Sequence, residues 1–178
     1  MCIRDRMNPP IRYTEDREKL WKRLKDGTID CIVTDHAPHT LESKSLGYPK
    51  APAGMPGVET SLPIMLTHAK EGKCSVSDVV RWMCAGPAKV YGIKNKGFLK
   101  EGFDGDLVLV DLEKNRTISD SDTWTRVGWT PYAGRSLTGW PMYTIVDGNI
   151  VHRRDNDGSL RGFSQALAGE SGRPLRFN

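Results

Sequence analysis

The chain has 178 residues, of which 38% are hydrophobic and 27% are charged, and its formal net charge is +4. This length suffices for one globular domain or for parts of two. The basic residues are spread along the chain, which argues against nucleic acid as a partner. There is no signal peptide and no apolar run near 18 residues, so we expect a cytoplasmic protein without a membrane partner.

The first 30 residues contain a leader, a stiff segment and a helix. Residues 1–6 have no recognisable pattern, and we interpret them as a non-native or unmatched leader. The prolines of the next segment, Asn8-Pro9-Pro10-Ile11-Arg12, make it rigid and extended. Asn8 is there either a positioned ligand contact or an ordinary loop residue. The apolar spacing then predicts a helix over 15–26, which Gly27 ends.

The next apolar run ends at a group of polar side chains. Residues 29–35, in which apolar and β-branched side chains predominate, predict a buried strand that ends on Asp35 and is followed by His36-Ala37-Pro38-His39. Three interpretations of this stretch remain open. Asp35 caps a turn, or Asp35 or a histidine binds a metal ion, or Asp35 is a general acid/base.

The middle of the chain reads as a long loop followed by helices. Residues 40–57 exceed the usual loop length, and Ala53 and Gly54 are small enough for the backbone to approach a ligand. Helical spacing predicts helices over 58–71 and 76–85. Ser75 and Asp78 form a capping box for the second helix, which Gly86-Pro87 is expected to stop. Pro87 can then start a further short helix toward Tyr91.

The sequence pattern changes at Gly97, and the residues that follow predict strands rather than helices. Residues 106–111 predict a strand, and residues 143–152 predict a hairpin whose turn is Asp147-Gly148. From Arg153 the chain is polar and rich in glycine.

Taken together, several segments resemble the C-terminal portion of class I dihydroorotases, members of the cyclic amidohydrolase superfamily. The segments are Asn8-Pro9-Pro10-Ile11-Arg12, Asp26-Gly27-Thr28-Ile29-Asp30, Thr34-Asp35-His36-Ala37-Pro38-His39, the glycines at 54 and 57 with Glu59-Thr60, and Gly86-Pro87-Ala88. Two later stretches, 102–111 and 144–148, resemble the β-domain that the superfamily shares.

The resemblance implies an α/β fold. It would be the C-terminal part of a metal-dependent-hydrolase TIM-type (β/α)8 barrel, followed by part of a small β-sandwich domain. Residues 7–95 would supply the last strands and helices of the barrel, residues 96–152 the sandwich portion, and residues 153–178 a polar tail.

It also implies a site and a reaction. Asp35 would be the catalytic residue and a zinc ligand, Asn8 and His39 would bind the substrate, and Ala53 and Gly54 would contact its ring through the backbone. The reaction would be the reversible, zinc-dependent hydrolysis of dihydroorotate to N-carbamoyl-aspartate in de novo pyrimidine biosynthesis. The residue types suit this reaction. The leaving nitrogen needs a proton, which Asp35 can carry, and an anionic substrate needs a hydrogen-bond donor, which His39 or Arg12 would provide.

The chain departs from the family in its metal ligands. The resemblance calls for a His-x-His pair and further upstream ligands of two zinc ions, but the four histidines form no such pair, and Asp35 alone matches a ligand. One carboxylate does not hold catalytic zinc. We therefore expect a fragment that is inactive alone, whose partner is the missing N-terminal half, and which is a homo-oligomer when complete.

Three other interpretations remain. The chain is a fragment of an allantoinase or hydantoinase, a metal-free, non-catalytic dihydroorotase-like subunit, or an unrelated small binding protein with a chance motif. His39 separates the first of these from a dihydroorotase, because a substrate that carries a carboxylate needs a hydrogen-bond donor at that position.

Overall fold

The computed structural model describes residues 7, 8, 10, 13–154, 160, 161, 172 and 174–177. The predictions for the leader 1–6, for Arg12 and for most of the tail after 154 lie outside these residues. The described chain forms two compact units. The first comprises Met1–Ile29, Val33–Ile64 and Arg116–Leu137, and the second comprises Asp30–Ile32, Met65–Asn115 and Thr138–Asn178.

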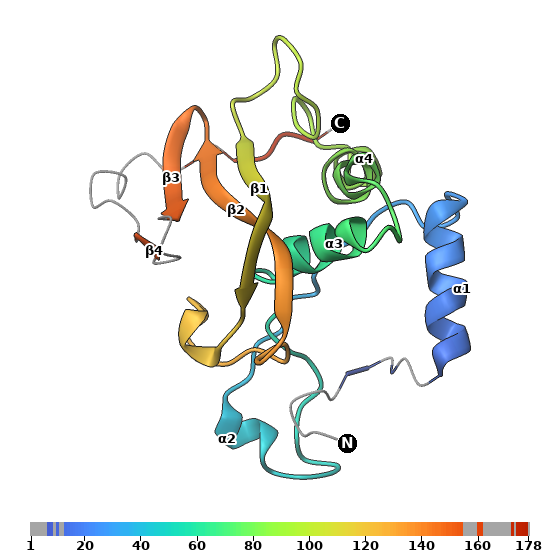
Figure 1. The fold of residues 1–178 in the computed structure, drawn as a ribbon, viewed down its shortest axis with the longest axis vertical. Helices are drawn as coiled ribbons and strands as arrows, with labels where there is room; N and C mark the ends of the chain where they lie inside the picture. The colour runs from blue at the N-terminus through green and yellow to red at the C-terminus, as the bar shows by residue number, and fades with distance from the viewer. Residues whose placement is uncertain are drawn as a thin grey trace. The chain divides into compact units, whose positions relative to one another are not determined.

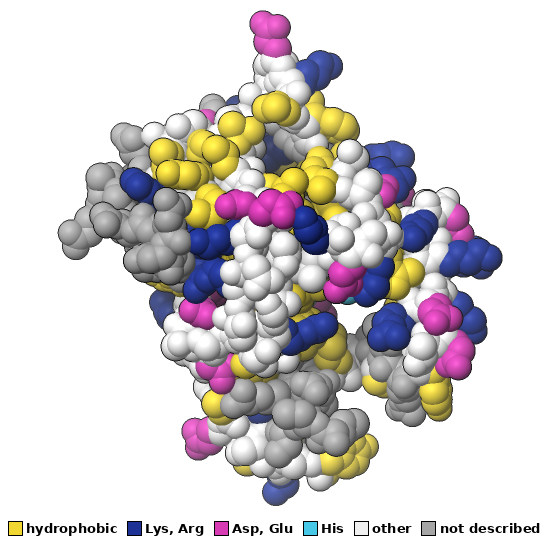
Figure 2. All heavy atoms as spheres, viewed as in Figure 1, with side chains coloured by type: hydrophobic (Ala, Val, Ile, Leu, Met, Phe, Trp, Pro, Cys, Tyr) yellow, Lys and Arg dark blue, Asp and Glu magenta, His cyan; other side chains and the backbone are white. Residues whose placement is uncertain are grey.

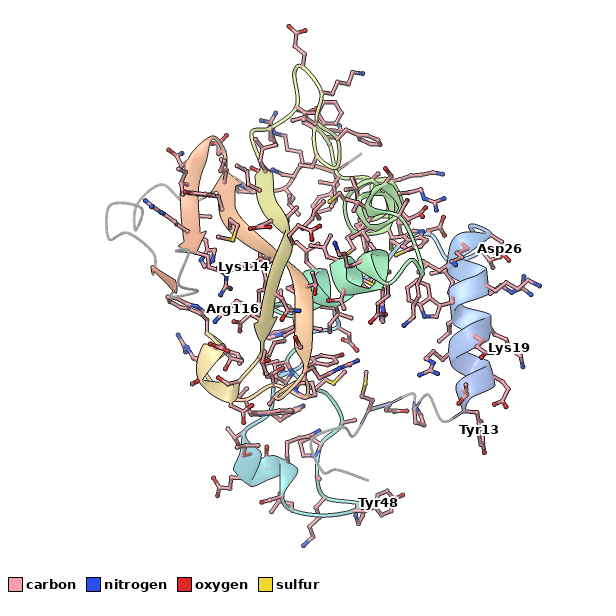
Figure 3. The ribbon with its side chains drawn as sticks, viewed as in Figure 1. Tyr13, Lys19, Asp26, Tyr48, Lys114 and Arg116 are labelled. Atoms are coloured by element: carbon pink, nitrogen blue, oxygen red, sulfur yellow. The ribbon has the colours of Figure 1, made fainter. Side chains whose placement is uncertain are left out.

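The first unit contains the predicted N-terminal helix. Helix α1 covers Thr14–Lys25 (Figure 1), within one residue of the predicted bounds at each end. Its first turn carries acidic residues and its last turn basic ones, which suits the helix dipole. Figure 3 shows Tyr13 and Asp26 at its two ends.

The loop that follows the Asp-His motif contains a short helix, α2 (Leu41–Lys44). The side chain of Thr40 caps α2 by accepting a hydrogen bond from the backbone N–H of Ser43. Beyond α2, Tyr48 is 89% exposed and lies at the outer end of the loop (Figure 3). The long loop therefore begins with a capped helix, and near its middle, at Tyr48, it extends into solvent.

The predicted strand over 29–35 is wrong for this structure, because these residues have no strand conformation. A strand exists through the ladder that it forms with a neighbour, and a barrel strand needs one on each side. Within the described residues no strand lies beside this segment. Instead, the segment forms a backbone hydrogen bond to a residue far along the sequence, from Ile32 N–H to Trp82 O at 2.9 Å.

Several helices lie between residues 61 and 90, and from Met65 on they belong to the second unit. Helix α3 covers Ser61–Lys70, α4 covers Val76–Val80, a π-helical turn η2 covers Arg81–Ala85, and α5 covers Gly86–Val90. The capping box of Ser75 and Asp78 is confirmed. The short helix expected from Pro87 toward Tyr91 is confirmed as α5, but the backbone stays helical through Gly86 and does not stop there. Pro87 has no N–H to donate, and the wide turn, in which Gly86 N–H reaches Arg81 O, accommodates it.

The β-rich segment forms a four-stranded sheet in the order β1-β2-β3-β4 (Figure 1). The strands are β1 (Leu107–Thr117), β2 (Ser136–Val146), β3 (Asn149–Arg154) and β4 (Leu160–Arg161), with the 3-10 turn η3 (Asp120–Asp122) between β1 and β2. The hairpin is confirmed. Asp147 and Gly148 both have positive φ, at +51° and +81°, as a type I′ turn requires.

Strand β1 is longer than predicted and largely exposed. Figure 2 shows hydrophobic side chains at the surface where Figure 1 places the start of β1 and the loop before it. The exposed apolar residues there are Phe98, Leu99, Leu107, Val108 and Leu109. The described residues form one sheet, so the second sheet of a β-sandwich stays a prediction. None of the described helices is long and apolar enough to cross a membrane.

Candidate functional site

Asp35 has an unusual backbone conformation. Its φ is +42°, which is in the left-handed region that non-glycine residues rarely adopt. Its side chain is exposed, and among the described residues its carboxylate has neither a hydrogen bond nor an ion pair. Strained, unpaired polar residues of this kind gather at functional sites. The carboxylate is therefore available to a ligand.

His36 fixes the motif to the segment that precedes α3. Its Nδ1 atom accepts hydrogen bonds from the backbone N–H groups of Gly57, at 3.1 Å, and Val58, at 3.3 Å. An imidazole nitrogen that accepts carries no proton, so the ring proton is on Nε2. His36 is not among the site residues that the resemblance implies, and its position next to Asp35 is the one signal in the sequence that points to it.

His39, Ala53 and Gly54, three of the predicted substrate-binding residues, lie together in the structure. His39 Nε2 donates to the carbonyl oxygen of Ala53 at 3.0 Å, since a carbonyl can only accept. A second bond, 3.2 Å long, joins Ala37 N–H to Met55 O. A Cβ atom added to Gly54 would lie 2.8 Å from Ala37 Cβ and 3.3 Å from His39 Nε2. The backbone of the motif and the backbone of the Ala53-Gly54 turn are thus in direct contact.

Lys44 lies behind this turn and is almost fully buried, with 1% of its surface exposed. Its Nζ donates to the carbonyl oxygens of Pro52, at 3.0 Å, and Gly54, at 2.9 Å. No signal in the sequence points to Lys44, because a lysine in a polar loop is normally a surface residue.

Residues of the 116–137 segment support the motif from farther along the chain. Trp129 is fully buried, and its Nε1–H donates to the carbonyl oxygen of His39 at 2.8 Å. The carboxylate of Glu59 accepts hydrogen bonds from the backbone N–H groups of Trp124 and Thr125, at 2.8 and 2.9 Å. The backbone of the motif is therefore anchored at His39 by a residue 90 positions away, and Glu59, which follows the loop, is joined to the same segment.

Asn8 is not joined to the other predicted site residues by a hydrogen bond. It lies in a bend and is exposed, and its side chain has no hydrogen-bond partner within the described part of the chain. Arg12, the alternative donor for an anionic substrate, lies outside the described residues.

Two surface hollows lie away from the motif. One, of about 590 Å³, is lined by residues of α1 and its C-terminal end. The other, of about 240 Å³, is lined by Lys96, Asp104, Asp106, Val146, Asp147 and Leu175. Lys96 donates hydrogen bonds to Asp106 and Asp104. Both raise the pKa of Lys96 above its ordinary value, and the bond to Asp106 has the larger effect. Neither hollow includes a predicted site residue.

The residues present do not form a metal site by themselves. Among the described residues, no three His, Cys, Asp or Glu side chains are grouped closely enough to hold an ion. Asp35 offers one carboxylate, whereas a catalytic zinc site needs about three protein ligands. The donor set of this chain alone therefore does not fit zinc.

Comparison with known proteins places these observations in a family. Solved structures of hydantoinases share the fold. The D-hydantoinase (dihydropyrimidinase) from Thermus sp. matches 98% of this chain with a TM-score of 0.85 and 27% identity. The L-hydantoinase (dihydropyrimidinase) from Arthrobacter aurescens matches 89% with a TM-score of 0.79 and 35% identity. These matches cover 38% and 36% of the two proteins and support part of a TIM-barrel hydrolase fold.

A model of the amidohydrolase family matches residues 2–151. The chain belongs to the amidohydrolase family. It is 43% identical over 147 residues to the dihydroorotase of Halalkalibacterium halodurans, which covers 82% of this chain, and 42% identical over 147 residues to that of Pyrococcus furiosus, which covers 83%. The predicted resemblance to dihydroorotases is confirmed. The chain spans about a third of the length of these relatives, 34% of each.

Proposed function

We propose that this chain is part of a dihydroorotase, which reversibly hydrolyses the cyclic amide of dihydroorotate to N-carbamoyl-aspartate in pyrimidine biosynthesis. The relatives of more than 40% identity support this proposal. The observation that carries it is the hydrogen bond between His39 and Ala53. It joins the Ala53-Gly54 turn to a group able to bind an anion, four residues along the chain from Asp35, whose carboxylate is unpaired among the described residues.

Asp35 is the proton carrier in this proposal. Hydrolysis adds water to the ring carbonyl carbon and breaks the bond from that carbon to the ring nitrogen. The attacking water loses a proton, and the leaving nitrogen gains one. Asp35, exposed and unpaired in the described chain, accepts the first proton and delivers the second. In ring closure the same transfers run in reverse.

His39 binds the substrate carboxylate in this proposal. Its Nε2–H is engaged by Ala53 O, so Nδ1 is the ring atom that remains for a ligand. To donate to a carboxylate, Nδ1 must also carry a proton, and the substrate-bound ring is then an imidazolium. Ala53 and Gly54 contact the ring through their backbone, and Asn8 provides a further polar contact.

The metal ligands other than Asp35 come, in this proposal, from polypeptide that this sequence does not contain. That polypeptide is the N-terminal half of the enzyme, which carries the histidines for two zinc ions. Zinc supplies an electrophile and an activated water in reactions of this class. The complete protein is a cytoplasmic homo-oligomer whose barrel portion includes residues 7–95 and whose β-sandwich portion includes residues 96–152.

A hydantoinase is the second candidate, because solved hydantoinases share the fold at up to 35% identity. Hydantoin and dihydrouracil lack the carboxylate that distinguishes dihydroorotate. The choice between a dihydroorotase and a hydantoinase therefore depends on whether His39 binds a substrate carboxylate. An allantoinase-type fragment and a metal-free subunit are the other outcomes that an assay must separate.

The test uses the full-length protein, encoded by the complete reading frame that contains this chain. The frame is expected to encode a His-x-His half upstream of Met7. The values of kcat/KM for dihydroorotate and dihydrouracil are compared, since these rings differ in the carboxylate. We expect a preference of about 100-fold or more for dihydroorotate, and His39→Gln should reduce it. Preference for dihydrouracil or hydantoin would overturn the substrate, and a folded protein that binds no zinc would favour the metal-free subunit.

A further inference from the structure

We propose that Lys44 is a positioning residue. It sets the two peptide planes on either side of Ala53-Gly54 so that their N–H groups are presented to the substrate. The proposal rests on the proposed function, since it concerns how the same turn binds a cyclic amide. Lys44 itself does not touch the substrate.

The burial of Lys44 is the first observation. An ammonium group that leaves water is costly unless its donors are paired. Lys44 is 1% exposed, and two of its bonds go to backbone carbonyls of one turn, those of Pro52 and Gly54. Because these carbonyls lie two residues apart, a single ammonium fixes the rotation of two peptide groups.

The geometry of the peptide group gives the second step. The peptide bonds between residues 52 and 53 and between 54 and 55 are trans. In a planar trans peptide the N–H points away from the carbonyl of the preceding residue. With Pro52 O and Gly54 O directed at Lys44, the N–H groups of Ala53 and Met55 are directed away from it. Neither N–H has a hydrogen-bond partner among the described residues.

His39 completes the arrangement by binding the carbonyl between these two. Its Nε2 donates to Ala53 O, so three consecutive carbonyls, 52 to 54, accept hydrogen bonds from the side chains of Lys44 and His39. A cation on the oxygen side of a peptide polarises it and strengthens its N–H as a donor. The two free N–H groups therefore suit an oxygen that carries negative charge, such as a ring carbonyl or carboxylate oxygen of a dihydropyrimidine.

The effect of losing Lys44 follows from this geometry. In Lys44→Met the aliphatic stem remains, but the carbonyls of Pro52 and Gly54 lose their donor and are free to rotate. The N–H groups then bind the substrate less well. Because the ring oxygens that they contact are present in both substrate and transition state, KM should rise with little change in kcat.

The experiment measures KM and kcat of the full-length protein with dihydroorotate, and its unfolding by urea. Lys44→Met should raise KM about tenfold and change kcat by less than about threefold. Lys50→Met is the matched control, since Lys50 lies in the same loop and is exposed, and among the described residues it has no partner. It should leave both constants and the unfolding midpoint unchanged.

Each other outcome decides a different point. If folded Lys44→Met keeps the wild-type KM, or loses kcat alone, the positioning role is wrong. If it does not fold, Lys44→Gln replaces it. Its neutral amide is one bond shorter and cannot hold both carbonyls in place, so KM should again rise, and an unchanged KM overturns the proposal. If the wild type prefers hydantoin, the substrate proposal fails and the same KM comparison on hydantoin tests Lys44. A wild type that turns over neither ring overturns both.

Discussion

Replacing Gly54 by alanine tests the contact between the Asp-His motif and the substrate-binding turn. Gly54 has φ of +119°, where a side chain is strained by about 1–3 kcal/mol. The added Cβ would also lie 2.8 Å from both the Cβ and the carbonyl oxygen of Ala37. No rotamer change can relieve contacts with these atoms, so the two segments must separate.

Separation would weaken the His39–Ala53 hydrogen bond, which contributes about 0.5–1.5 kcal/mol. We therefore expect Gly54→Ala to lower the free energy of unfolding by about 2–4 kcal/mol and to raise KM more than about tenfold. Gly47→Ala is the matched control. Gly47 has φ of +72°, and a Cβ there would meet nothing within 4 Å, so the backbone strain acts alone.

The measurements are urea unfolding and steady-state kinetics of the two full-length variants. Gly47→Ala should cost about 1 kcal/mol of stability and leave KM near its wild-type value. If Gly54→Ala is no more harmful than Gly47→Ala in both measurements, the close approach of the motif and the turn does not matter, and the reasoning is refuted.

Three further predictions concern other residues. Asp35→Asn should lower kcat by at least about 100-fold with an unchanged unfolding midpoint, because the side chain is exposed and unpaired in the described chain; a wild-type kcat would remove Asp35 from the mechanism. Trp129→Phe should lower the free energy of unfolding by about 1–3 kcal/mol in urea, since it leaves the part-buried carbonyl of His39 without its indole donor; no change would show that water replaces the indole. Hydrogen bonds from the backbone and hydroxyl of Ser75, followed by Arg81, hold the pKa of Asp78 below its ordinary value of 3.8. The ionised Asp78 therefore stabilises the fold above pH 3.8, and this contribution is lost as the pH falls through the lower pKa of the folded state. The difference in free energy of unfolding between wild type and Asp78→Ala should shrink as the pH is lowered. A difference that stays constant with pH would contradict the lowered pKa.

Local chemistry was readable from the sequence where neighbouring residues decide the structure. Asp147-Gly148 specified its hairpin turn because both positions need positive φ, and Ser75 and Asp78 specified their capping box. The resemblance also grouped His39 with Ala53 and Gly54, which the structure joins by a hydrogen bond, although their roles stay predictions.

Features that depend on distant partners were not readable. The segment 29–35 has the composition of a strand, but in the described chain it has no strand to pair with. Gly86-Pro87 is typical of a helix end, yet the backbone stays helical from the π-helical turn into α5, the short helix that Pro87 was expected to start. Lys44 reads as a surface residue, and its burial arises from the fold of the loop around it.

The most direct test of the central claim is ring closure of N-carbamoyl-aspartate by the zinc-loaded full-length protein. It is measured before and after removal of the metal with a chelator, and in parallel with Asp35→Asn. We expect dihydroorotate formation that disappears with the metal, returns with zinc and is nearly absent in the variant. A folded, zinc-loaded protein that forms no dihydroorotate, or an Asp35→Asn variant as active as the wild type, would contradict it.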